Sequence, residues 1–341
     1  MSRVAVLGAG SWGTALAVHA AGQGHEVRLV CRGADAAATL ARDRENRTYL
    51  RHVPFPDALQ ATADASGAVS DAELILVVTP VKGLELAARW LAESREPGRI
   101  VICCAKGIRP DSLETPAAFL RTRRPDLVPA ICVLSGPTFA AELAKGHPTA
   151  AVVAADDVSI AARVQRELAG GALRLYASND PIGVELGGAL KNVMALAAGV
   201  VDGLGYGTNT RAALVTRGLS ELTRLAVACG AAAGTLSGLA GMGDLILTCS
   251  GSLSRNRHVG VELGKGRSLA EITDAMHMVA EGVATTRAAL ELSRRESVEM
   301  PIVEQVASIL FDGRAPAAAL NALLARDLTT EDGAGIDASR V

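Results

Sequence analysis

The sequence predicts two domains: an α/β N-terminal domain built on a doubly wound sheet, and an all-α C-terminal domain. Two observations support this prediction. Short β-rich runs alternate with helical stretches up to about residue 180, and from Pro181 onward the β-rich runs vanish and helical patterns dominate. Several of the runs are apolar without alternation, which is typical of parallel strands covered on both faces. The expected boundaries are 1–180 and 181–341.

The expected elements follow one another in a regular order. The β-rich runs are residues 4–7, 27–31, 74–78, 100–104, 131–134, 150–153 and 173–176. In the second half, residues 182–204 and 210–229 are each long enough for a helix, and Gly230 would end the second one. Ser268 and Glu271 have the spacing of a capping box, and Pro301 suits the first turn of another helix that ends before Gly313.

Composition and charge exclude several classes of protein. Hydrophobic residues make up 49% and charged residues 21% of the 341 residues, and the net charge is −2. The chain therefore lacks the basic surface expected of a protein that binds nucleic acid or an anionic membrane. No uninterrupted apolar run reaches the roughly 20 residues that cross a bilayer. Gly8 and Gly10 interrupt the short N-terminal apolar segment before a signal-peptide core could form. We expect a cytoplasmic protein.

The cysteines and histidines do not indicate a metal site. The six cysteines show no C-x-x-C pairing, and the six histidines are scattered. Cys103 and Cys104 are adjacent, which leaves a redox role open. Alternating faces of a buried strand explain the pair more simply.

A glycine-rich motif stands at the start of the first domain. Gly8, Gly10 and Gly13 have the G-x-G-x-x-G spacing, between the run 4–7 and a helix-compatible stretch at 14–21. The first glycine allows a tight turn, the second lets a pyrophosphate approach the backbone, and the third lets the helix pack closely. The helix N-terminus then faces the phosphates. The motif predicts a Rossmann-type dinucleotide-binding domain rather than an ordinary glycine turn.

Three further polar segments follow predicted strands. They are Thr79-Pro80, Lys106-Gly107 and Ser135-Gly136-Pro137-Thr138. Because ligands of open α/β sheets bind at the carboxyl ends of the strands, we expect all three at the same rim as the glycine motif. Lys106 would be well placed to contact a ligand there. From position alone, a solvated surface lysine explains it equally well.

The residues after the second strand bear on the choice of dinucleotide. An acidic residue about 20 positions after the glycine motif, at the end of that strand, would bind the ribose hydroxyls of NAD. Here the strand is followed by Arg32, and Glu26 precedes the strand, at its wrong end. A guanidinium in that place suits the 2′-phosphate of NADP. We therefore expect NADPH/NADP as the cofactor, with NADH/NAD also compatible.

One lysine lies inside an apolar, glycine-rich stretch of the second domain. At helical spacing the neighbours of Lys191 are Gly187, Gly188, Met194 and Ala195. Small neighbours allow close approach, and an apolar wall would lower the pKa of the lysine, so that it could act as a general acid or base near neutrality. The alternative is a structural lysine whose stem is buried and whose amine reaches water.

A second polar motif follows Gly241-Met242-Gly243-Asp244. Ser254, Arg255 and Asn256 stand together at an expected helix start. A hydroxyl, a guanidinium and an amide at that place form a candidate phosphate cradle. The alternative is a plain N-cap at Ser254.

Together these residues resemble the NAD(P)-dependent sn-glycerol-3-phosphate dehydrogenase family, in its bacterial form. The matching segments run in the family order over nearly the whole chain: G-A-G-S-W-G-T-A at 8–15, E-N-R-T-Y-L at 45–50, C-A-K-G-I at 104–108, S-G-P-T-F-A-A-E at 135–142, G-A-L-K-N-V at 188–193, G-M-G-D-L at 241–245, S-R-N-R at 254–257 and V-A-E-G at 279–282. Two positions depart from the family pattern. Thr138 stands where Ser is frequent, and Gly33 where a second basic residue often follows Arg32.

The resemblance implies a set of site residues. Those implied to contact the cofactor are Ser11, Trp12, Arg32, Lys106, Ala140, Arg255, Val279 and Glu281. Those implied to line the substrate site are Lys106, Gly136, Thr138, Lys191, Asp244, Ser254, Arg255 and Asn256. The resemblance further implies that Lys191 transfers the proton, while Lys106 and Asp244 orient and polarise the substrate.

The expected function is the interconversion of dihydroxyacetone phosphate and sn-glycerol 3-phosphate, which feeds glycerophospholipid synthesis. The resemblance leaves a homodimer open. Two other functions also remain open from the sequence. One is a dehydrogenase of related architecture acting on a β-hydroxy acid or a ketopantoate-like substrate, which would not need Ser254, Arg255 and Asn256. The other is a non-catalytic NAD(P)-sensing protein, which would not need a buried Lys191.

Overall fold

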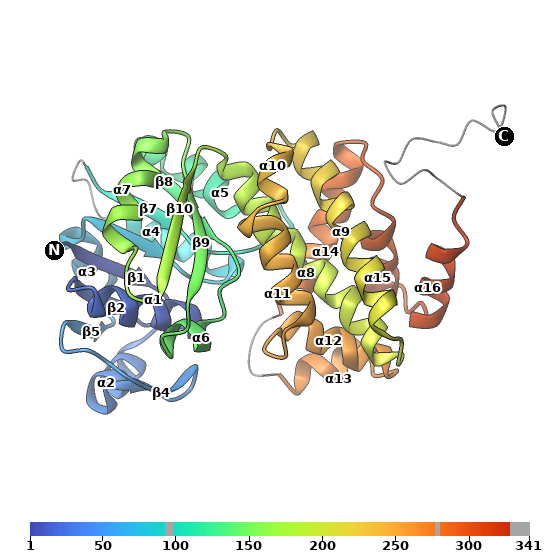
Figure 1. Cartoon of the computed structure of the whole chain (residues 1–341). Coiled ribbons are helices and arrows are strands. Elements are labelled where there is room, and N and C mark those ends of the chain that lie inside the picture. The colour runs from blue at the N-terminus through green and yellow to red at the C-terminus, as the bar shows by residue number, and fades with distance from the viewer. Residues whose placement is uncertain (93–97, 277–279, 328–341) are drawn as a thin grey trace.

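The computed structural model describes residues 1–92, 98–276 and 280–327. In Figure 1 a sheet flanked by helices, blue to green, lies beside a group of helices, yellow to red. The strands of the sheet lie between Arg3 and Ser178, and every helix from Pro181 onward in the described residues belongs to the second group. We call these two parts the sheet unit and the helical unit.

The sheet has eight strands in the order β10-β9-β8-β7-β6-β1-β2-β5. Their bounds are β1 (Arg3–Leu7), β2 (Glu26–Val30), β5 (Leu59–Thr62), β6 (Leu74–Val77), β7 (Ile100–Cys103), β8 (Ile131–Ser135), β9 (Thr149–Ala154) and β10 (Leu173–Ser178). Each β-rich run of the sequence forms one of these strands. The edge strand β5 and a separate hairpin, β3 (Glu45–Asn46) with β4 (Leu50–Pro54), were not predicted, because these strands are short and more than half of their residues are polar.

The expectation of a parallel sheet is wrong at one place. The pairs from β5 through β8 are parallel, but β9 pairs with β8 in the antiparallel sense, and β10 runs parallel to β9. A parallel return would need a crossover along the length of the sheet. The link between β8 and β9 contains only the five-residue helix α6 (Ala140–Ala144), which spans about 7.5 Å. The chain therefore turns back at the same rim.

Helices cover both faces of the sheet, which confirms the doubly wound arrangement. Along β1, Val4 and Val6 face one buried cluster, whereas Ala5 and Leu7 face the other. The first cluster is covered by α1 (Ser11–Gly22), α2 (Ala34–Asp43), α6 and α7 (Val158–Leu168). The second is covered by α3 (Ala65–Asp71), α4 (Leu84–Ala92) and α5 (Pro116–Arg123). Short 3₁₀ turns lie at Val81–Gly83 and Pro125–Ala130.

The helical unit is built around α8 (Pro181–Gly203), which is buried over nearly its whole length. By length and composition it is the one helix in the described residues that could cross a membrane, but its apolar window lies entirely inside the protein. The surrounding helices are α9 (Thr208–Ala228), α10 (Ala233–Leu236), the π-helical turn η3 (Leu239–Gly243), α11 (Asp244–Ser250), α12 (Arg255–Gly264), α13 (Leu269–Asp274), α14 (Glu281–Arg295), α15 (Pro301–Phe311) and α16 (Pro316–Leu324).

The helix signals of the second half are confirmed. The two long predicted helices are α8 and α9. Ser268 and Glu271 form the capping box of α13 in both directions. Pro301 is in the first turn of α15, and Gly313 follows its end with φ 69°.

Glycines bring α12 into backbone contact with α8. A Cβ at Gly260 would lie 2.1 Å from the Leu196 carbonyl oxygen, and a Cβ at Gly199 would lie 2.1 Å from the Arg257 carbonyl oxygen. Gly203 and Gly264 repeat this close approach one turn further along. The N-terminus of α12, where Ser254, Arg255 and Asn256 stand, is thereby held close to the helix that carries Lys191.

Candidate active site

The predicted rim residues gather at one edge of the sheet. Strands β1, β6, β7 and β8 are parallel, so the segments after them emerge on the same side. The Lys106 ammonium, after β7, donates a hydrogen bond to the Gly136 carbonyl, after β8, at 3.0 Å. Thr138 donates from Oγ1 to the same carbonyl at 3.1 Å. The sheet unit thus brings Lys106, Gly136 and Thr138 together.

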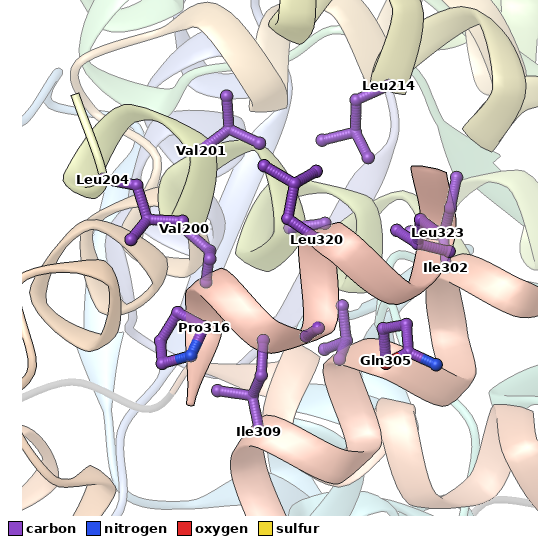
Figure 2. Close-up of a pocket in the computed structure, with 13 residues that line it drawn as sticks. Val200, Val201, Leu204, Leu214, Ile302, Gln305, Ile309, Pro316, Leu320 and Leu323 are labelled. Atoms are coloured by element: carbon purple, nitrogen blue, oxygen red, sulfur yellow. The ribbon is translucent and has the colours of Figure 1, made fainter. Parts of the chain in front are cut away.

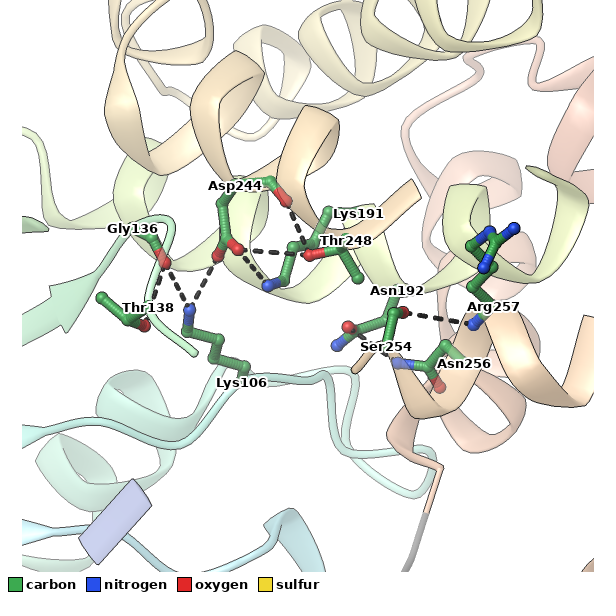
Figure 3. Close-up of polar contacts among 10 residues, drawn as sticks. All are labelled: Lys106, Gly136, Thr138, Lys191, Asn192, Asp244, Thr248, Ser254, Asn256 and Arg257. Carbon is green, nitrogen blue, oxygen red and sulfur yellow. Dashed lines mark hydrogen bonds and ion pairs between the residues drawn. The ribbon is translucent and has the colours of Figure 1, made fainter. Parts of the chain in front are cut away.

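Two lysines from the two units meet on one carboxylate. Lys106 Nζ donates to Asp244 Oδ2 at 2.7 Å, and Lys191 Nζ donates to Asp244 Oδ1 (Figure 3). Asp244 has no solvent exposure and Lys191 is 7% exposed. The expectation of a buried lysine in a glycine-rich helix is confirmed, and its amine is paired with Asp244.

The glycines beside Lys191 allow this convergence. A Cβ at Gly187 would lie 2.6 Å from the Ala240 carbonyl oxygen, in the π-helical turn that leads into Asp244. A Cβ at Gly188 would lie 2.4 Å from Ser135 Oγ and 3.6 Å from the Lys106 stem. The sequence predicted that small neighbours of Lys191 would allow another group to approach closely. In the structure the approaching groups are Ala240 and Ser135 of the protein itself.

Burial determines the electrostatics of this cluster. It lowers the pKa of Lys191 to about 7, and the nearby Lys106 ammonium adds to the lowering, while the Asp244 carboxylate opposes it. Two amines share a single carboxylate, so the cluster carries an excess positive charge when both are protonated. Such a site favours negative charge that develops on a bound molecule.

Sequence reasoning missed two residues of this site. Thr248 donates from Oγ1 to the Asp244 carbonyl at 2.6 Å, and its Oγ1 lies 3.3 Å from Asp244 Oδ1. Its position one helical turn after Asp244 is the signal that could have found it. Asn192, next to Lys191, accepts at Oδ1 from Asn256 Nδ2 at 2.9 Å.

The expected phosphate cradle lies beside this cluster. Ser254 is the N-cap of α12 and accepts from the Arg257 backbone N–H at 3.2 Å, so the plain N-cap is present. Asn256 is buried and also accepts from the Gly282 backbone N–H at 3.0 Å, which ties α8, α12 and α14 together. Arg255 has no hydrogen bond or ion pair to any residue that the structure describes. The residue is exposed at the start of α12, and its guanidinium attracts the Glu281 carboxylate electrostatically.

The glycine-rich loop has the shape that a dinucleotide requires. Gly8 has φ 121°, and a Cβ there would lie 2.9 Å from the Val78 carbonyl oxygen. A Cβ at Gly13 would lie 1.9 Å from the Gly8 carbonyl oxygen, whereas Gly10 faces open space. Asn46, in the hairpin, donates to the Ala9 carbonyl at 2.9 Å and holds the loop in place.

Several buried polar atoms around the same loop and rim have no hydrogen-bond partner among the described residues. They are Trp12 Nε1, Thr79 Oγ1, Ser135 Oγ and Thr285 Oγ1. A buried polar group without a partner is costly, so such groups commonly mark the position of a ligand. The residues present therefore fit a dinucleotide that spans the rim of the sheet.

The remaining expected cofactor residues lie around this rim. Arg32 follows β2, is exposed and has no ion pair among the described residues, and Glu26 is at the opposite end of that strand. Ser11 begins α1 and Ala140 begins α6. Glu281, at the start of α14, is hydrogen-bonded to the Val81 backbone, and burial raises its pKa. Val279 lies outside the described residues.

An apolar pocket elsewhere does not suit the expected ligands. It lies between the second half of α8, α15 and α16 (Figure 2), and is lined almost entirely by aliphatic side chains such as Val200, Leu204, Ile309 and Leu320. A charged dinucleotide or a phosphorylated substrate would lose its hydration there without replacement. In the described residues, no group of three or more His, Cys, Asp or Glu side chains could hold a metal ion.

The chain is similar to known proteins along nearly its whole length. The profile of the NAD-dependent glycerol-3-phosphate dehydrogenase N-terminus matches residues 3–161, and that of the C-terminus matches residues 180–321. A glycerol-3-phosphate dehydrogenase [NAD(P)+] of Nitratidesulfovibrio vulgaris is 45% identical over 329 residues, which cover 96% of this chain and 100% of that protein. One from Aromatoleum aromaticum is 48% identical over 328 residues, 95% and 98% of the two chains. The crystal structure of glycerol-3-phosphate dehydrogenase from Coxiella burnetii matches with TM-score 0.88 and 36% identity, covering 95% and 99%.

Proposed function

The chain belongs to the NAD-dependent glycerol-3-phosphate dehydrogenase family, and from that premise we propose which of its residues carry out the reaction. It is an NAD(P)-dependent oxidoreductase that interconverts dihydroxyacetone phosphate and sn-glycerol 3-phosphate. The two other functions that the sequence left open are set aside by these matches. The observation that supports the proposed roles is the meeting of Lys106 and Lys191 on the buried Asp244.

Lys191 is the proton donor for ketone reduction. Its pKa of about 7 lets it carry a proton near neutrality and release it to an oxygen that becomes basic as the carbonyl is reduced. Asp244 holds the ammonium in place, and Lys106 polarises the substrate oxygen with its positive charge. In the reverse direction, neutral Lys191 accepts the hydroxyl proton. When bound, the dinucleotide supplies or accepts the hydride.

Arg255 holds the substrate phosphate, together with the N-terminus of α12. A dianion placed there meets the Arg255 guanidinium, backbone N–H groups of the first helical turn and the positive end of the helix dipole. The Ser254 hydroxyl lies at the same helix start, and Asn256 has one N–H beyond the one that it donates to Asn192. Binding at a site remote from the carbonyl orients the reacting carbon.

The sheet unit, residues 1–180, binds the dinucleotide, and residues 181–341 provide the substrate-binding and catalytic groups. The dinucleotide contacts Ser11 and Trp12 at the glycine-rich loop, and further along it contacts Lys106, Ala140 and Glu281.

Arg32 binds the 2′-phosphate of NADP. The Arg32→Ala substitution should raise KM for NADPH and leave KM for NADH nearly unchanged, because only the 2′-phosphate loses a contact. Equal increases for the two cofactors would contradict this role.

The function is tested with the purified protein. It should oxidise NADPH in the presence of dihydroxyacetone phosphate and not in the presence of 2-oxo acids. Lys191→Ala should lower kcat by about 10²–10⁴-fold while dinucleotide affinity persists, and Lys191→Arg should not restore it because guanidinium releases a proton poorly. Lys265→Ala, at an exposed lysine, is the matched control. Near-normal kcat in Lys191→Ala would refute the assignment.

We place the enzyme in the cytoplasm, where sn-glycerol 3-phosphate enters glycerophospholipid synthesis. This placement comes from the family resemblance. A strain without the gene should need supplied glycerol 3-phosphate, and growth without that supplement would contradict the role in glycerophospholipid synthesis. Recovery of the enzyme in the membrane fraction of lysed cells would contradict the cytoplasmic placement.

A further inference from the structure

A buried carboxylate joins the helix that carries Lys191 to the segment that carries Lys106. Glu185, in the second turn of α8, is 5% exposed. Its Oε2 accepts from the Thr115 hydroxyl at 2.6 Å and its Oε1 accepts from the Ala117 backbone N–H at 2.7 Å. These donors lie at the N-terminus of α5, which has no side-chain cap of its own. Glu185 therefore caps a helix of the sheet unit from the helical unit.

Glu185 lies where the two units interlock. Its neighbour Val184 belongs to the buried cluster on the α5 face of the sheet. In the opposite direction, Ile108, two residues after Lys106, belongs to the buried core of the helical unit. The segment 104–115 thus leaves the sheet at Lys106, enters the helical core at Ile108 and returns to α8 at Thr115.

Each of the two lysines is connected to the Glu185 contact by a short stretch of chain. Lys191 is six residues after Glu185 on the same helix, about 9 Å along its axis. Lys106 lies near the start of the segment whose end, at Thr115, Glu185 binds. The site needs both amines on Asp244, and Asp244 itself stands on a third element, α11. A shift of α5 and its preceding segment against α8 would therefore move Lys106 relative to Lys191.

We propose that Glu185 is a positioning residue for the reaction: by binding the N-terminus of α5 to α8, it fixes the 104–115 segment so that Lys106 and Lys191 meet on Asp244. This inference rests on the proposed function of the two lysines. Glu185 acts through these neighbours and does not itself touch the substrate.

The contact requires an acceptor at Oε1, whereas the Thr115 hydroxyl can either donate to the other carboxylate oxygen or accept from a donor in its place. The Ala117 N–H can only donate, so a proton on Oε1 would replace an attraction by a repulsion. Burial raises the pKa of Glu185 to about 7, while the two hydrogen bonds and the Arg121 guanidinium of α5 oppose the increase. On β7, the titratable thiol of Cys103 also interacts with Glu185.

The chain contains a matched control for this contact. Glu221, on α9, is 4% exposed and accepts from the Ile302 backbone N–H at 2.8 Å and the Val303 N–H at 3.4 Å. It also caps a helix that begins with proline, and burial also raises its pKa to about 7. Both partners of this contact lie in the helical unit, away from Lys106. Alanine removes both carboxylate oxygens, so Glu185→Ala and Glu221→Ala make the same chemical change with and without the proposed coupling.

The experiment compares both variants with the wild type, well below all melting temperatures. Both should melt at a lower temperature than the wild type, because each loses a buried cap. Only Glu185→Ala should lose kcat, by about 10-fold or more, since small misplacements of reacting groups have effects of that size, while its KM for NADPH stays unchanged. Unchanged kcat in Glu185→Ala, or an equal loss in Glu221→Ala, would overturn the inference.

A second pair of variants tests the same contact from the other side. Thr115→Val removes the hydroxyl that Glu185 binds, and Thr115→Ser keeps it, so only the valine variant should lose kcat. This pair decides the outcome if Glu185→Ala does not fold, and equal kcat in both variants then overturns the inference. If Lys191→Ala is fully active, the proposed function has failed. If Lys191→Ala is inactive but Glu185→Ala and Thr115→Val are unaffected, only the positioning role has failed.

Discussion

Lys191 titrates near neutral pH, and its two protonation states serve the two directions of the reaction. Burial beside Asp244 and Lys106 lowers its pKa to about 7. Ketone reduction needs protonated Lys191, so kcat for reduction should fall as pH rises through about 7. Alcohol oxidation needs the neutral amine, so kcat for oxidation should rise over the same range.

The measurement is kcat against pH in both directions at saturating substrates. Opposite slopes near pH 7 are expected, and the same residue accounts for both limbs. Slopes of the same sign in the two directions would show that another group controls the proton.

Arg255 determines the preference for a phosphorylated ketone. It is the first residue of α12 and forms no hydrogen bond or ion pair within the part of the chain that the structure describes, and backbone donors also converge there. Arg255→Ala should weaken dihydroxyacetone phosphate strongly, because a charge-assisted contact is lost. Unphosphorylated dihydroxyacetone, a poor substrate for the wild type, should be affected much less.

The measurement is the ratio of kcat/KM for the two ketones, because this ratio separates a defect in substrate binding from a defect in cofactor binding. Arg255 is also expected to contact the dinucleotide, and a cofactor defect would lower both values together. If both ketones lose kcat/KM by the same factor, Arg255 does not bind the substrate phosphate.

Among the elements, the contact between α8 and α12 sets the distance between the proton-transfer lysine and the phosphate cradle. Gly260→Ala would place a Cβ 2.1 Å from the Leu196 carbonyl oxygen, and backbone on both sides cannot move away cheaply. We expect a loss of about 1–3 kcal/mol in unfolding free energy, the usual cost of overpacking. The displaced α12 should also weaken the Asn256 to Asn192 contact and lower kcat/KM for dihydroxyacetone phosphate.

Gly234→Ala is the control for this substitution. Gly234 lies in the short helix α10, and a Cβ there meets no atom within 4 Å. Its unfolding free energy should stay within about 0.5 kcal/mol of the wild type. Chemical denaturation of the two variants gives both values, and equal stabilities would contradict close backbone packing between α8 and α12.

The elements also show what the sequence can and cannot predict. The apolar runs and the long helices were found because burial on both faces leaves a continuous pattern, as in β7 and α8. The antiparallel turn into β9 was missed because it depends on the reach of a five-residue helix. The hairpin β3–β4 was missed because its role depends on Asn46, a polar residue whose partners are 32 and 37 positions away.

In the site, too, local features were predictable from the sequence, whereas contacts between distant residues were not. A lysine with a lowered pKa was predictable from its apolar, small neighbours, because desolvation acts locally. Its partners were not predictable from spacing, because Lys106 and Asp244 are separated by 138 positions and only the fold brings them together. For the same reason the role of Glu185 was not predictable from the sequence, because its hydrogen-bond donors, Thr115 and Ala117, lie in the other unit.

In the whole molecule, the two units are joined by contacts that need both to be folded. Lys106 is paired with Asp244, Glu185 caps α5, and Glu281 is bound by the Val81 backbone. Val184 and Ile108 are each buried in the core of the opposite unit. Unfolding one unit would leave these charges and apolar side chains without partners, so we expect the two units to unfold in one cooperative step.

The two tryptophans make this expectation testable without labels. Trp12 and Trp90 both lie in the sheet unit, on α1 and α4, so tryptophan fluorescence reports that unit alone. Far-UV circular dichroism near 222 nm reports helices, and long helices such as α8 and α9 are in the helical unit. In thermal or denaturant unfolding, the two signals should change at the same midpoint. NADPH should raise both midpoints by the same amount although the glycine-rich loop is in the sheet unit, because a ligand stabilises everything that unfolds with its site. Separate midpoints, or a cofactor shift confined to fluorescence, would mean that the contacts between the units are too weak to couple them.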